Sequence, residues 1–108
     1  MPQGSKLTRD GIRILQGTPS APLARSTLFL RILQTVKPGE QTRTRATLWM
    51  ARPNSGGYVI KELIPDMELE PQEALDKAVA IAKRGEVREI YINADLNRLP
   101  SVAARAAG

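Results

Sequence analysis

The residues best suited to binding chemistry lie in the segment TRTRATLW, residues 42–49. Arg43 and Arg45 are two residues apart, and Trp49 follows Arg45 four residues later. Side chains two residues apart in a β-strand lie on the same face, so all three would share one face. Guanidinium groups bind phosphate, and both guanidinium and indole groups stack on bases. This spacing predicts a surface for a negatively charged, flat ligand, with nucleic acid as the first hypothesis.

The charge of the chain is distributed unevenly along the sequence. The 108 residues carry a net charge of +5, and the pI is about 10.1. Residues 1–61 contain ten Lys and Arg against two acidic residues, a net charge of +8. Residues 62–108 contain six Lys and Arg against nine acidic residues, a net charge of −3. Such polarity predicts an anionic partner, with nucleic acid favoured over a membrane surface.

The residue types that the chain lacks narrow its chemistry. It contains no cysteine and no histidine, which excludes a disulfide scaffold, a thiolate zinc site and a Ser-His-Asp triad. We therefore expect a protein that is not an enzyme and that has no cofactor. The sequence shows no apolar run near the roughly 20 residues that span a bilayer and no signal-peptide core at its start, so we expect no membrane contact and a cytoplasmic location.

Two segments predict a β-hairpin, the first by its length and β-branched content and the second by its alternation with period two. Residues 26–36 and 42–52 are the two strands, and KPGEQ between them fits a turn. The apolar faces should pack in the core, because a buried arginine without a partner costs several kcal/mol. The expected core face contains Leu28, Leu30, Ile32, Leu48 and Met50. The opposite face then contains Phe29, Arg31, Leu33, Arg43, Arg45, Thr47 and Trp49.

Three weaker strands complete the expected sheet. They are residues 11–17 as a short N-terminal strand, residues 58–64, in which Ile60 should face the core, and residues 87–93. PNSGG, residues 53–57, predicts a hairpin turn, since a phosphate-binding loop would need a following Lys-Ser/Thr and a helix.

Residues 71–85, PQEALDKAVAIAKRG, predict one amphipathic helix. Pro71 suits its first turn, Gly85 suits the C′ position, and Lys83 and Arg84 lie at the negative end of the helix dipole. The apolar arc of this helix is rich in alanine, which allows a close approach to a sheet. One helix of this length covers only one face of a sheet.

Together these elements predict a single small α+β domain. Its sheet would have four or five mainly antiparallel strands in the order β-β-β-α-β, with an optional extra strand at the N-terminus, and one covering helix. The domain would span residues 11–100, between a flexible N-terminal arm at 1–10 and a flexible tail at 101–108.

The sheet face opposite the helix is then the expected binding site. We expect sequence-tolerant binding of DNA or RNA, with a single strand favoured, in which basic side chains neutralise phosphates and aromatic rings stack on bases. The predicted site residues are Arg31, Lys37, Arg43, Arg45, Trp49, Arg52, Tyr58, Lys61 and Tyr91. An alternative hypothesis uses the same face for protein interaction or for a homodimer.

The acidic run Glu62, Asp66, Glu68 and Glu70 supports a third hypothesis, a small metal-dependent nuclease, because carboxylates at such spacing bind Mg²⁺. A simpler interpretation is that Glu70 and Glu73 stabilise the helix N-terminus and the other acids solvate a loop. We therefore assign no catalytic and no metal-binding residue.

Overall fold

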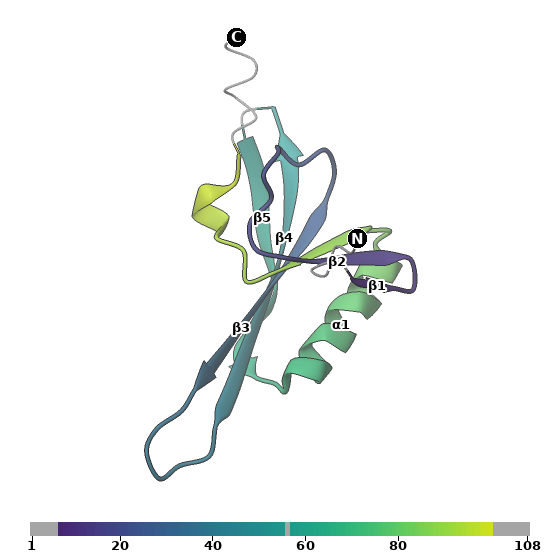
Figure 1. The fold of residues 1–108 in the computed structure, drawn as a ribbon. Helices are drawn as coiled ribbons and strands as arrows, with labels where there is room; N and C mark the ends of the chain where they lie inside the picture. Colours follow the sequence, from purple (N-terminus) through teal and green to yellow (C-terminus); the bar gives the residue numbers. More distant parts are fainter. Residues whose placement is uncertain (1–6, 56, 101–108) are drawn as a thin grey trace, which may run out of the picture.

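The computed structural model describes residues 7–55 and 57–100, which form one small α+β domain of a six-stranded mixed sheet and one α-helix (Figure 1). The predicted fold class is confirmed, with more strands than the four or five expected. The elements are β1 (Leu7–Arg9), β2 (Ile12–Gln16), β3 (Thr27–Thr35), β4 (Arg43–Asn54), β5 (Gly57–Glu68), α1 (Pro71–Arg84), β6 (Glu89–Ile92) and the short 3₁₀ helix η1 (Leu96–Arg98).

The strand order in the sheet is β1-β2-β6-β3-β4-β5. Strands β1 and β2, β3 and β4, and β4 and β5 pair antiparallel. Strand β6 is the last strand of the described residues, yet it lies between β2 and β3 and runs parallel to both. The chain reaches this position through α1, which crosses one face of the sheet between the edge strand β5 and the inner strand β6 (Figure 1).

The main hydrophobic core lies between α1 and the sheet. Three alanines of α1, Ala74, Ala78 and Ala82, are fully buried in one core cluster with the sheet residues Leu28, Leu30, Leu48 and Ile90. Small side chains let the helix backbone approach the sheet closely, as the alanine-rich arc predicted. The expected alternation in β3 and β4 is confirmed, because Leu28, Leu30 and Leu48 are on the α1 side and Phe29 is on the other.

The C-terminus of α1 differs by one residue from the prediction. Gly85 has an ordinary φ of −96°, and the left-handed residue is Glu86, with a φ of 58°. The Val87 amide donates to the Ala82 carbonyl at 2.8 Å, and the Glu86 amide donates to the Lys83 carbonyl at 3.4 Å. These two bonds define a Schellman motif in which Glu86, and not Gly85, takes the C′ position.

The face of the sheet opposite α1 is covered around Phe29 and Ala51, which corrects the prediction that this face is uncovered. Leu23, Phe29 and Ala51 are buried there in a second apolar cluster. Residues 18–26 and 93–100 cross this face and bring Leu96 and Leu99 onto the cluster. Both segments contain turn residues, so the sequence identified them as connections. Their leucines nevertheless require burial, and this face is where they are buried.

Two boundaries and the exposure of one side chain also differ from the predictions. Residues 7–9 form β1 and are therefore part of the sheet, although they were assigned to the N-terminal arm. Strand β5 continues through Pro65 to Glu68, which an edge strand tolerates because one side of it has no ladder to break. Ile60 is 45% exposed, so its predicted place in the core is wrong. The predicted tail, 101–108, and residues 1–6 lie outside the described residues.

Polar contacts join β1 and its turn to α1. The Arg9 guanidinium donates to Asp76 Oδ1 at 2.7 Å, and Lys83 lies 3.6 Å from Asp10. The hydrogen bond from Arg9 holds the pKa of the Asp76 carboxyl below its ordinary value. Both contacts are exposed, so they fix the position of β1 more than they stabilise the fold.

Candidate functional site

The predicted site residues are distributed over both faces of the sheet. Arg31, Arg43, Arg45, Trp49, Tyr58 and Tyr91 belong to the face opposite α1, and Lys37 lies in the loop between β3 and β4. Lys61 pairs with Met50, whose side chain packs in the α1 core, so Lys61 lies on the α1 side. Arg52 follows Met50 by two residues in β4 and shares that side. Six of the nine residues therefore share one face, but they are spread along the sheet from Arg43 beside the hairpin turn to Tyr58 at the far end of β4. Arg52 and Lys61 lie on the other face.

The aromatic residues of this face are engaged in packing. Phe29 is only 2% exposed, and its ring stacks on Tyr91 with centroids 5.6 Å apart and planes 20° from parallel. The Tyr58 hydroxyl donates to the Pro100 carbonyl at 2.6 Å and accepts from the Leu23 amide at 3.1 Å. Trp49 lies opposite Phe29 in the strand register and is half-buried. These rings mainly fix residues 18–26 and 93–100 to the sheet.

The two arginines of the opening motif have carboxylate partners. Arg45 Nε donates to Asp66 Oδ1 at 2.9 Å, and Arg43 Nε lies 3.8 Å from Glu68 Oε2. The basic residues come from β4 and the acidic residues from β5, so the charge asymmetry along the sequence is partly neutralised in space. All four side chains are exposed, and exposed pairs of this kind contribute about 0–1 kcal/mol.

The acidic residues of the third hypothesis face these arginines. Within residues 7–55 and 57–100, no group of three or more acidic side chains is arranged to hold a metal ion. Asp66 and Glu68 instead pair with Arg45 and Arg43. The nuclease hypothesis thus has no built metal site to support it in the part of the chain that the structure describes.

The β3–β4 hairpin extends well beyond the body covered by α1 (Figure 1). We call residues 31–45 the hairpin arm. Every residue from 33 to 43 is exposed. The arm carries Arg31, Lys37, Arg43 and Arg45 against one acid, Glu40. No carboxylate of the described residues lies within ion-pair distance of Arg31 or Lys37.

Two shallow grooves adjoin the hairpin arm on the face opposite α1. A groove of about 720 Å³ lies at the base, where Arg31, Leu33, Trp49 and Ile60 face residues 93–97. A smaller one, about 280 Å³, lies near the tip between Lys37, Gln41 and the two β4 arginines. Cationic side chains thus border both grooves.

No protein-family model, curated protein or solved structure matches this chain. The described part of the chain contains no helix long and apolar enough to cross a bilayer.

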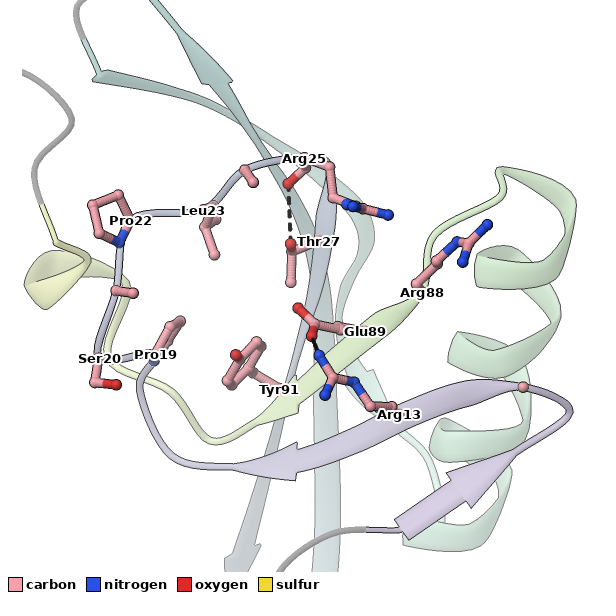
Figure 2. Close-up of a pocket in the computed structure, with 13 residues that line it drawn as sticks. Arg13, Pro19, Ser20, Pro22, Leu23, Arg25, Thr27, Arg88, Glu89 and Tyr91 are labelled. Atoms are coloured by element: carbon pink, nitrogen blue, oxygen red, sulfur yellow. Dashed lines mark hydrogen bonds and ion pairs between the residues drawn. The ribbon is translucent and has the colours of Figure 1, made fainter.

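Sequence reasoning did not find the pocket beneath the loop of residues 19–25. Arg13, Arg25 and Arg88 border it, and Tyr91 lines it (Figure 2). Only Tyr91 was among the predicted site residues. Arg13 and Arg88 are far apart in the sequence, and they are brought together because β6 inserts beside β2. No spacing rule along the chain could signal that contact.

Proposed function

We propose that the protein binds nucleic acid through the hairpin arm. The observation that carries the proposal is an exposed, two-stranded antiparallel ribbon that projects from the body and carries four cationic side chains and one acidic one (Figure 1). The major groove of B-DNA is wide enough to admit a two-stranded β-ribbon. An arm of this kind reaches into a groove while the body of the protein stays outside the duplex.

The packing of the aromatic rings favours a duplex over the single strand expected from the sequence. A stacking platform needs ring faces that are open to bases. Phe29 is buried, the Tyr58 hydroxyl is used within the chain, and Tyr91 lines the pocket under residues 19–25 and not the grooves at the arm. Of the four aromatic residues on the face opposite α1, Trp49 alone lines the groove at the base of the arm, together with Arg31. A stacking role for one ring is compatible with an arm that enters a groove.

Charge on the arm supports contact with phosphates. Arg31 and Lys37 have no carboxylate partner among the described residues, so they can bind phosphate without breaking an ion pair. Arg43 and Arg45 would exchange exposed carboxylates for phosphate oxygens, which form strong charge-assisted hydrogen bonds with guanidinium groups. Four phosphate contacts would make the affinity fall with salt, with a logarithmic slope of about −0.9 for each contact.

The test compares two variants that remove the same charge. Arg31→Ala/Lys37→Ala removes the two arm cations that have no carboxylate partner, and Lys77→Ala/Arg84→Ala removes two exposed cations of α1. Fluorescence anisotropy of a labelled 20-base-pair duplex would measure affinity at several salt concentrations. We expect the arm variant to bind about tenfold more weakly with a shallower salt slope, and the α1 variant to keep both. Equal losses in the two variants would show attraction by net charge and would contradict the proposal.

The edge of the sheet at β5 favours a second candidate function, self-association. Strand β5 is the last strand of the sheet and has no neighbour on its outer side within the described residues. Val59 and Ile60 on this edge are 41% and 45% exposed. Long edge strands with exposed apolar side chains pair readily with another strand. A homodimer through β5 would also place two hairpin arms in one particle.

A further inference from the structure

A pocket of about 600 Å³ lies on the face opposite α1, near β2 and β6 and separate from the grooves at the hairpin arm. Figure 2 shows its outline: the loop of residues 19–25 forms one wall, and Arg13, Glu89 and Tyr91 rise from the sheet on the other side. Its volume falls within the range typical of small-molecule sites. The residues that border it come from three separate stretches of the chain, 11–13, 19–27 and 88–91, so the pocket exists only in the folded domain.

Hydrogen bonds fix the loop that covers the pocket. The Leu23 side chain is buried, and its amide donates to the Tyr58 hydroxyl at 3.1 Å. The Thr27 hydroxyl donates to the Arg25 carbonyl at 3.1 Å, where the loop enters β3. Pro19 and Pro22 restrict the backbone between these points. The pocket is therefore formed before any ligand enters, which lowers the entropic cost of binding.

Three arginines and one glutamate give the pocket its charge. The Arg13 guanidinium pairs with the Glu89 carboxylate, which neutralises both groups. Arg25 and Arg88 have no carboxylate within ion-pair distance among the described residues. Figure 2 places both of these side chains at the same end of the pocket. That end therefore carries two positive charges that a ligand can neutralise.

The opposite end of the pocket is aromatic and apolar. Tyr91 is half-buried and its ring is held by the stacked ring of Phe29. In Figure 2 the Tyr91 ring points toward Pro19 and Leu23 of the loop. A flat ring between Tyr91 and the loop would bury apolar surface on both sides, in an offset-stacked arrangement with the tyrosine.

We propose that this pocket binds a small ligand in which an aromatic ring is joined to a phosphate group. The ring would pack against Tyr91, and Arg25 and Arg88 would bind the phosphate. Phosphate suits this end better than carboxylate, because two guanidinium groups can each take a pair of oxygens only if at least three oxygens are offered. Nucleoside monophosphates and simple aryl phosphates share this chemistry.

Isothermal titration calorimetry on the full chain would test the proposal. The probes are phenyl phosphate and adenosine 5′-monophosphate, with inorganic phosphate and phenol as the separate halves of the ligand. The pocket variants are Arg25→Ala/Arg88→Ala and Tyr91→Leu. The hairpin-arm variant Arg31→Ala/Lys37→Ala removes the same charge as the first and serves as the matched control. Circular dichroism would establish that each variant is folded.

We expect at least one of the two aromatic phosphates to bind about tenfold or more tightly than inorganic phosphate or phenol. The double arginine variant should weaken that binding about tenfold, Tyr91→Leu should weaken it severalfold, and the arm variant should leave it unchanged. Binding of adenosine 5′-monophosphate alone would identify the ring as a nucleobase, and binding of both would support any aryl phosphate. If neither exceeds inorganic phosphate, or if the double arginine variant binds as wild type, the proposal is wrong. Duplex binding measured on the same variants tests the hairpin arm independently.

Discussion

At the scale of single residues, Glu86 at the C-terminus of α1 has a backbone conformation that is unfavourable for any residue except glycine. Its φ of 58° lies in the left-handed region, which costs an L-residue about 1–2 kcal/mol. Its carboxylate also lies at the negative end of the dipole of α1. Glu86→Gly removes both penalties and adds some chain entropy to the unfolded state. We expect a gain of about 0.5–1 kcal/mol in the free energy of unfolding, measured by urea denaturation.

The variant Glu86→Ala separates the two effects, because it removes the charge and keeps the Cβ atom that strains the left-handed backbone. We expect Glu86→Ala to gain much less than Glu86→Gly. Equal stability of the two variants would show that backbone strain at this position is negligible. The sequence predicted Gly85 at C′ because glycine is the usual residue there. The hydrogen bonds of the Val87 and Glu86 amides place Glu86, the next residue, at C′ instead.

At the scale of elements, one hydroxyl connects three separate segments. Tyr58 on β5 donates to the carbonyl of Pro100 and accepts from the amide of Leu23. Tyr58→Phe leaves both backbone groups without this partner in a partly buried place. We expect a loss of about 1–3 kcal/mol in the free energy of unfolding, and faster hydrogen exchange at the Leu23 amide. Tyr91→Phe is the matched control, since the Tyr91 hydroxyl makes no hydrogen bond among the described residues. A stability unchanged by Tyr58→Phe would mean that water replaces the hydroxyl.

Periodicity in the sequence was sufficient to identify the central elements. The alternation in 26–36 and 42–52 identified β3 and β4 and their core faces, and the 3.6-residue pattern of 71–85 identified α1. Those patterns arise because each element buries one face. The buried leucines of residues 18–26 and 93–100 follow no regular spacing in the sequence. The sequence therefore could not show that these segments cover the sheet face opposite α1. The insertion of β6 between β2 and β3 is a long-range pairing that no local pattern records.

At the scale of the whole molecule, the fold rearranges the charge that the sequence separates. The basic first half and acidic second half meet where β4 and β5 pair, and Arg45 and Asp66 form an ion pair there. Net positive charge is retained where the chain leaves the body, on the hairpin arm, and at the pocket bordered by Arg25 and Arg88. The overall charge of the sequence predicts an anionic partner, and only the topology indicates which surfaces keep the positive charge.

Strand β5 has an unpaired edge among the described residues, and through this edge the sheets of two copies could join. Two copies that pair their β5 strands antiparallel, about a two-fold axis at Ile60, would form one continuous sheet and bring the two Ile60 side chains together. Ile60→Lys places charges there, which opposes pairing of edge strands. We expect sedimentation to show a wild-type dimer and a monomeric Ile60→Lys variant. Val36→Lys adds the same charge at an apolar residue of the hairpin arm that is 69% exposed, and it should remain a dimer. A wild-type monomer at every concentration, or loss of the dimer in both variants alike, would exclude β5 as the specific interface.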